Sequence, residues 1–280
     1  MLDALQFEFM RNALFAGLLA SIICGVIGTL IVVNRLVFLS GGIAHSAYGG
    51  IGLASFLGWP YMLGATLFAF ASAMLMAAIS IKAKERSDTL IGVMWSVGMA
   101  MGIILLDLTP GYNVDLMSYL FGSILSVPRS ELLFMTFLGV GILLLTSYYY
   151  RDLLAMSYDA EFAQVRGVPV RGLYFLLIGM VAVTVVIVVQ IVGLILVIAL
   201  LTVPPYISEK YTRSLLQMML VSSLLGMLFI TGGLWCSYTY DLTSGATIIL
   251  ISGCGFMLSL LLDKLLSLKR KIQWRRAHAL

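Results

Sequence analysis

Apolar residues gather in long unbroken runs along this chain, and short polar stretches separate the runs. Six of them stand out, at 12–33, 60–81, 131–150, 173–203, 215–235 and 244–262. A helix needs about 20 apolar residues to cross a bilayer, and these runs reach that length. They lack the alternation of apolar and polar residues that the strands of a membrane β-barrel require. The pattern therefore predicts an all-α polytopic membrane protein, with one domain over residues 1–280.

The runs and the shorter apolar stretches between them predict about nine crossings, eight at the fewest. The predicted spans are 12–33, 41–57, 60–81, 90–106, 131–150, 172–190, 193–206, 215–235 and 244–263. The span 193–206 is short, so we expect it to pack behind its neighbours after a turn at Gln190–Gly193. Residues 116–126 are apolar but too short to cross, which predicts an interfacial or re-entrant helix.

Composition supports lipid as the main solvent of this chain. Hydrophobic residues make up 61% of the sequence and charged residues 11%, with a mean hydropathy of +1.05. Soluble domains are roughly half apolar and about a quarter charged, so one aqueous core would not hide this much apolar surface. The formal net charge of +4 is modest, and we expect no nucleic-acid partner.

The basic residues predict which side of the membrane each loop occupies. With nine spans and a cytoplasmic C-terminus, 15 of the 17 Lys and Arg residues face the cytoplasm, six of them in a basic tail at 264–280. Only Arg11 and Arg129 lie outside. Because cytoplasmic loops are enriched in Lys and Arg, we expect the N-terminus to be external and the protein to lie in a plasma (inner) membrane.

His45 is the one ionisable residue that lies away from the predicted span ends. Such residues are costly in a membrane and are therefore functional candidates, and a neutral imidazole suits first-row divalent metals. From this residue alone, a hydrogen bond to a neighbouring helix is the favoured alternative. Small residues recur around it on overlapping faces, which predicts close helix packing; they are Gly42, Ser46, Gly49, Gly50, Gly52 and Ala54.

Other candidate chemistry is sparse. Asp107, Asp115 and Asp241 fall near the predicted external face, where they either concentrate cations or are simply solvated. The sequence contains no phosphate-binding GxxxxGK[ST] loop, no HExxH and no GxSxG pattern. We therefore expect no enzymatic activity in this chain. If the chain takes part in transport driven by ATP, the ATPase must be another polypeptide.

The longest predicted cytoplasmic loop, 148–172, changes from apolar to charged along its length. Ser157 or Asp159 is suited to cap a short helix from about 160 to 166, and Gly167 with Pro169 ends it. One interpretation of this loop is a lever that docks on a partner and moves the adjoining spans. The other is an interfacial helix that lies on lipid headgroups.

Five stretches in order resemble the zinc/manganese-type permeases of ATP-binding-cassette importers, which are related to vitamin-B12 and siderophore permeases. The stretches cover most of the chain; they are FLSGGIAHSAYGGIGLA, DLMSYLFGSILSV, LLAMSYDAEFAQVRGVPV, VGLILVIALLTVPPY and YTYDLTSGATIIL. One departure concerns the aspartate that usually precedes the family's histidine by four residues. That position is Gly41 here.

The resemblance implies a vitamin-B12-importer-like permease fold and import of zinc, manganese or iron, with ATP bound by a partner. It also implies a homodimer, two copies of a cytoplasmic ATPase, and an external solute-binding protein. The segment 151–171 is then the coupling loop, with Ser157, Asp159, Glu161, Phe162, Arg166 and Gly167 as its contact residues. His45 becomes a weak, transient metal contact along the path, with Asp107 and Asp241 as further candidates.

Two other functions are alternatives to an ATP-driven permease. An ion-coupled secondary transporter needs carboxylates or unwound helices within the membrane. An intramembrane metalloenzyme needs several metal ligands and a base. Neither set of residues is present in the predicted spans, so the permease is favoured.

Overall fold

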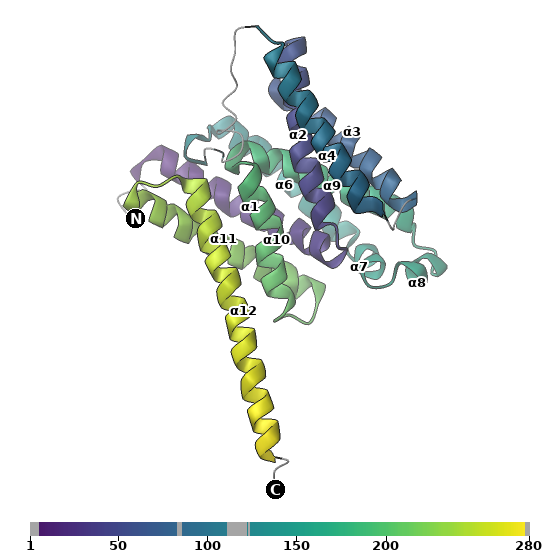
Figure 1. The fold of residues 1–280 in the computed structure, drawn as a ribbon, viewed down its shortest axis with the longest axis vertical. Coiled ribbons are helices and arrows are strands. Elements are labelled where there is room, and N and C mark those ends of the chain that lie inside the picture. The colour runs from purple at the N-terminus through teal and green to yellow at the C-terminus, as the bar shows by residue number, and fades with distance from the viewer. Residues whose placement is uncertain (1–5, 83–85, 111–121, 123, 278–280) are drawn as a thin grey trace.

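The computed structural model describes residues 6–82, 86–110, 122 and 124–277, and every regular element in these ranges is helical. The predicted all-α membrane architecture is confirmed (Figure 1). The elements are α1 (Glu8–Val33), α2 (Val37–Leu57), α3 (Tyr61–Lys82), α4 (Ser87–Asp107), η3 (Ile124–Ser126), α6 (Arg129–Tyr148), α7 (Tyr150–Tyr158), α8 (Ala160–Val165), α9 (Val170–Val192), α10 (Leu194–Glu209), α11 (Leu215–Tyr240) and α12 (Ser244–Ala277).

Each of the nine predicted spans is a helix. Seven of the described helices are long and apolar enough to cross a bilayer, namely α1, α3, α4, α6, α9, α11 and the Ser244–Leu265 part of α12. The remaining two are α2, whose 21 residues include many small and polar ones, and the short α10, with 16 residues. Gly193, at φ 85°, makes the predicted turn between α9 and α10. Most of the predicted helix 116–126 lies outside the described residues; its last three form η3.

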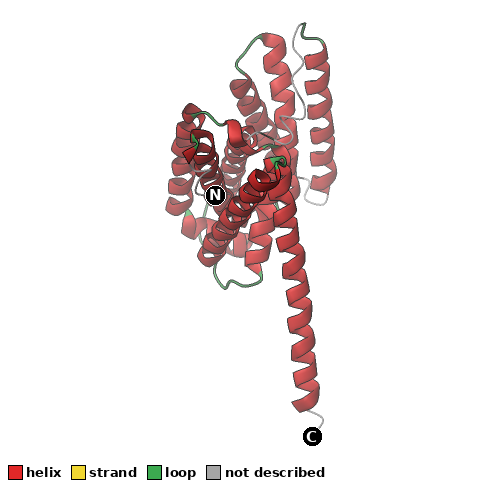
Figure 2. Ribbon diagram, turned by 90° about the vertical axis from the view of Figure 1, so that its left-hand side faces the viewer, coloured by secondary structure: helices red, strands yellow, loops and turns green. Residues whose placement is uncertain are grey.

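The helices form two groups with α9 between them (Figures 1 and 2). Helices α2, α3 and α4 pack together on one side, and α1, α10, α11 and α12 on the other. Helix α9 contacts members of both groups, and 78% of its most apolar stretch is buried, against 22% for α4. The centre of the bundle is therefore α9, while α4 lies at an edge and leaves much of its surface open.

One end of the bundle brings together three connections that are distant in sequence. The α1–α2 turn, the facing ends of α3 and α4, and the α7–α8 segment (Tyr150–Val165) line a common cavity of about 570 Å³. We call this region the loop end. It holds Arg35, Lys82, Arg86 and Arg171, all of which the charge pattern assigns to a single side of the membrane.

Helix α12 continues past its predicted end at residue 263. It has 34 residues, or about 51 Å of helix, whereas the hydrocarbon layer is about 30 Å thick. Residues 264–277 contain neither Gly nor Pro, so nothing in the sequence stops the helix where the charges begin. The predicted basic tail is therefore largely a helical extension, which projects beyond the bundle in Figures 1 and 2.

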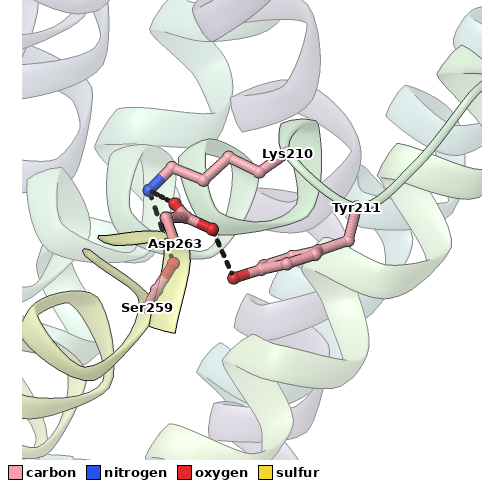
Figure 3. A network of polar contacts seen from close by, with 4 residues as sticks. All are labelled: Lys210, Tyr211, Ser259 and Asp263. Carbon is pink, nitrogen blue, oxygen red and sulfur yellow. Dashed lines mark hydrogen bonds and ion pairs between the residues drawn. The ribbon is translucent and has the colours of Figure 1, made fainter. Parts of the chain in front are cut away.

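A polar network fixes the α10–α11 turn to α12 (Figure 3). The ammonium of Lys210 lies 2.7 Å from Asp263 Oδ2 and donates to Ser259 Oγ at 3.4 Å. The Tyr211 hydroxyl donates to Asp263 Oδ1 at 3.0 Å. The hydrogen bond with Asp263 raises the pKa of Lys210, so the ammonium keeps its proton.

Candidate functional site

The helix that carries His45 is held against α3 and α4 by direct contact between backbones. A β-carbon on Gly52 would overlap the backbone of Gly102 in α4, and one on Gly50 would overlap Gly64 in α3. Small residues permit such close approach, which supplies packing energy between helices in lipid. The predicted small-residue faces of α2 are thus the faces it presents to α3 and α4. Of the four packing candidates, Gly42 meets Ile91 and Gly49 meets Gly98.

The imidazole of His45 stacks on the indole of Trp95 from α4. Their ring centroids are 4.0 Å apart and the planes differ by 13°. The indole Nε1 in turn donates to the sulfur of Met99 at 3.1 Å, one turn further along α4. A face-to-face stack leaves the edge of the imidazole free, so Trp95 fixes the plane of the ring without occupying either nitrogen.

A buried, unsatisfied nitrogen lies in this site. His45 Nδ1 is buried and has no hydrogen-bond partner in the described structure. Leaving a buried polar atom unpaired costs about 1–3 kcal/mol, so such atoms are rare without a functional reason. The hydrogen bond to a neighbouring helix that the sequence suggested is absent at this nitrogen. The residue as a whole is only partly buried.

Open space lies at Gly41, one helical turn before His45. A β-carbon at Gly41 would have nothing within 4 Å, although the residue itself is buried. Side chains on a helix lean toward its N-terminus, so His45 leans toward the turn that contains Gly41. The position that corresponds to the aspartate of the permeases that the sequence resembles therefore has room for a side chain.

The other two metal candidates lie elsewhere. Asp107 is the exposed last residue of α4, twelve residues beyond Trp95, which is about 18 Å along the helix. Asp241 is exposed and caps the end of α11 with φ 53°. Within the described residues, no three His, Cys, Asp or Glu side chains gather closely enough to hold a metal ion. A single chain thus presents one imidazole rather than a closed metal site.

The α7–α8 segment at the loop end has the local structure that its sequence predicts. Helix α8 spans Ala160–Val165, and Asp159 caps it by accepting a hydrogen bond from the Phe162 amide at 2.9 Å. Gly167, at φ 83°, turns the chain toward α9. Of the two capping candidates, Asp159 caps the helix, whereas Ser157 accepts a hydrogen bond from Asn34.

This segment also presents apolar side chains away from the bundle. Phe162 is 59% exposed, Val165 86% and Tyr158 71%. The guanidinium of Arg166 lies 5.9 Å above the Phe162 ring, and Glu161 is exposed beside it. Leu153, Met156 and Ala163 are buried and anchor the segment from the other side. The segment therefore has an exposed surface of apolar and charged side chains, and its buried side chains hold it against the bundle.

Two residues of this arrangement were not identified from the sequence. Trp95 lies in an apolar helix with no pattern that links it to His45, and Asn34 lies 123 residues before its partner Ser157. Both contacts join side chains across the fold, and periodicity along one helix carries no information about them. Their only sequence signal is chemical: a tryptophan within one apolar span and an asparagine directly after another.

Comparisons with known proteins agree over most of the chain. Residues 6–263 match the model of the ABC 3 transport family. An uncharacterized membrane protein of Synechocystis is 52% identical over 260 residues, which cover 93% of this chain and 92% of that protein. The manganese transport system membrane protein MntC of Halalkalibacterium halodurans is 31% identical over 255 residues, covering 91% and 87%. Among solved structures, PsaBC from Streptococcus pneumoniae in complex with Fab has a TM-score of 0.82 and 31% identity, covering 92% of this chain and 93% of that one.

Proposed function

This chain belongs to the ABC 3 transport family, and we propose that it is the membrane-spanning permease of an importer for a divalent transition metal, with manganese as the first candidate. The relative MntC is named for manganese transport. A neutral imidazole binds first-row divalent metals, and manganese is the one that it holds most weakly. The permease provides the path, and the hydrolysis of ATP takes place on a separate subunit.

The observation that carries this proposal is the surface of the α7–α8 segment. Exposed Tyr158, Phe162 and Val165 lie between two membrane helices, in a segment too charged and too short to insert into lipid. Aromatic side chains that protrude from a firm base are typical anchors of protein interfaces. We infer that this surface docks on the ATPase, with Glu161 and Arg166 setting the specificity of the contact.

His45 serves the transported ion transiently in this proposal. A conduit must bind its ion weakly enough to release it, and one imidazole meets that requirement where a closed four-ligand site would retain the metal. Asp107 and Asp241, at exposed helix ends, act earlier by drawing cations toward the external opening. Zinc and iron, which also accept imidazole ligands, are the alternatives to manganese.

The proposed assembly contains two copies of this chain and two ATPase subunits, with the path between the two permeases. An external solute-binding protein delivers the metal. The loop end and the C-terminus face the cytoplasm, because this orientation places 15 of the 17 Lys and Arg residues inside. The N-terminus is then external, and the protein lies in the plasma (inner) membrane of a prokaryote.

Transport by the reconstituted complex tests the proposal. The chain and its ATPase are co-expressed, purified together and placed in proteoliposomes, with the solute-binding protein and radioactive manganese on the outer side of the permease. We expect uptake that needs ATP and that excess unlabelled manganese suppresses more strongly than zinc or iron. Uptake that proceeds without the ATPase and follows a proton gradient would instead identify a secondary transporter.

A further inference from the structure

A polar contact links the α7–α8 segment to the turn from which the His45 helix starts. Asn34, the residue that caps the C-terminal end of α1, donates from Nδ2 to the Leu30 carbonyl at 2.8 Å and to Ser157 Oγ at 2.9 Å. The first bond fixes the Asn34 side chain to its own helix, and the second joins it to α7. An amide NH₂ has two donors, and these two acceptors use both.

Two backbone hydrogen bonds close the α1–α2 turn, so we expect it to move as a unit. Arg35 donates its amide to the Val32 carbonyl and Leu36 donates to Ile31, which is the bond pattern of a Schellman motif. Arg35 has φ 58° in that motif, a position that usually holds glycine. Helix α2 starts at Val37, so His45 lies about 12 Å along the same helix. A shift of Asn34 therefore moves the base of α2.

Ser157 lies in the proposed ATPase-docking segment, two residues before the cap of α8 and one before exposed Tyr158. Beside it, the cavity of about 570 Å³ separates Glu161 and Gln164 of α8 from Ser80 and Ser87 at the ends of α3 and α4. The segment has room to move relative to the α2–α4 group on that side. The Asn34–Ser157 bond joins the segment to the α1–α2 turn at the edge of this space.

Helix α1 distributes such a movement to the other helix group as well. Gly28 of α1 packs against the Leu201 carbonyl and Pro205 of α10, and Gly25 packs against the backbone of Ser223 in α11. Because the helices meet this closely at both contacts, we expect α1, α10 and α11 to shift together. Asn34 is therefore connected to the α2–α4 group through the α1–α2 turn and to α10 and α11 through α1.

We propose that the Asn34–Ser157 hydrogen bond couples movement of the α7–α8 segment, driven by the ATPase, to the α1–α2 turn and His45. We call this hydrogen bond the joint. Asn34 and Ser157 are positioning residues in this role. The inference rests on the proposed function, because it presumes that the ATPase moves this segment. The competing route runs through α9, which follows the segment in the chain and packs on α2.

The ratio of manganese imported to ATP hydrolysed tests the joint. Ser157→Ala removes the bond and leaves the Asn34–Leu30 contact intact, whereas Ser157→Thr keeps a hydroxyl. Loss of one hydrogen bond of ordinary strength predicts that the ratio falls about 2- to 10-fold in Ser157→Ala and is largely retained in Ser157→Thr. Ser147→Ala, at an exposed serine near the end of α6, is the matched control and should leave the ratio unchanged.

A double-mutant cycle separates the joint from a general loss of stability. Asn34→Ala with Ser157→Ala should lower the ratio no further than the more severe single variant, because both remove one interaction. Hydrogen exchange of the α1–α2 turn gives a second readout: binding of the ATPase should protect this turn in the wild type and protect it less in Ser157→Ala. Equal ratios and equal protection in wild type and Ser157→Ala would overturn the joint and favour α9. Failure of the proposed function is visible separately, as wild-type complexes that import no manganese.

Discussion

The α2–α4 layer around His45 and the loop end around α7–α8 are stabilised in opposite ways. In the layer, glycine backbones touch and a polar nitrogen is left buried without a partner. At the loop end, polar side chains are paired, as in the Asn34–Ser157 bond and the Asp159 cap, and apolar side chains are left exposed. The layer leaves a nitrogen that a metal ion would satisfy, and the loop end leaves apolar side chains that a protein partner would cover.

That difference assigns the two regions to different tasks, the binding of a metal ion and the binding of the ATPase. An unpaired imidazole nitrogen is suited to a small cation, and an exposed aromatic cluster is suited to a protein surface. Changes in the layer should therefore alter the handling of metal or the packing of the helices. Changes at the loop end should alter the contact with the ATPase.

The largest effect is expected where the backbones touch. Gly52→Leu places a side chain into the backbone of Gly102, and overpacking of this kind costs about 3 kcal/mol. We expect little folded protein after detergent extraction, measured as the monodisperse peak in size-exclusion chromatography. Gly41→Ala is the control, since its methyl group meets open space, and it should yield protein at the wild-type level.

The next effect concerns the exposed surface of α8. Phe162→Arg exchanges an anchor residue for a charge, and loss of an interface hot spot costs about 2 kcal/mol, or roughly 30-fold in affinity. The affinity is measured as binding of the purified ATPase to the permease in nanodiscs. The matched control is Tyr240→Arg, an aromatic residue of similar exposure at the end of α11. Unchanged affinity in Phe162→Arg would show that the ATPase docks elsewhere.

Most of the fold follows from the sequence because lipid imposes a simple rule. Helices must satisfy their own backbone groups in the membrane, so apolar runs of sufficient length predict the spans, including the turn before α10. Helix α8 was predictable for a local reason, since Asp159 and Gly167 act on residues adjacent in sequence. The end of α12 was not, because charged residues mark the edge of the membrane and do not stop a helix.

Much less of the candidate site follows from the sequence. His45 stands out because ionisable residues are rare in apolar spans, and this needs no structural information. The stack with Trp95, the open space at Gly41 and the bond from Asn34 to Ser157 all depend on how separate helices pack. A chain with only two histidines has no cluster pattern that would reveal them.

An intermediate effect is expected from filling the space beside His45. Gly41→Asp adds a carboxylate one helical turn from the imidazole, and two ligands should tighten manganese binding about tenfold, or ~1.4 kcal/mol. Equilibrium dialysis with radioactive manganese measures the affinity. The isosteric Gly41→Asn separates the effect of charge from that of volume, and equal affinities for the two variants would exclude a metal position at this space.

The smallest effect is expected at the cap of α8. Asp159→Ala removes the acceptor for the Phe162 amide, and loss of such a cap costs about 1 kcal/mol. The docking helix frays more easily, so ATPase affinity should fall about fivefold. Asp159→Asn retains a capping oxygen and should bind as the wild type does. If both variants bind with full affinity, the order of α8 does not limit docking.

ATP-driven manganese uptake by His45→Ala, measured together with ATP hydrolysis, tests the division of tasks most directly. The variant keeps the loop end intact, so we expect it to assemble with the ATPase and to hydrolyse ATP within about twofold of the wild type. Its manganese uptake should fall by about tenfold or more, a loss of ~1.4 kcal/mol. Wild-type uptake by His45→Ala in the same proteoliposomes would contradict the assignment of the histidine to the path of the metal.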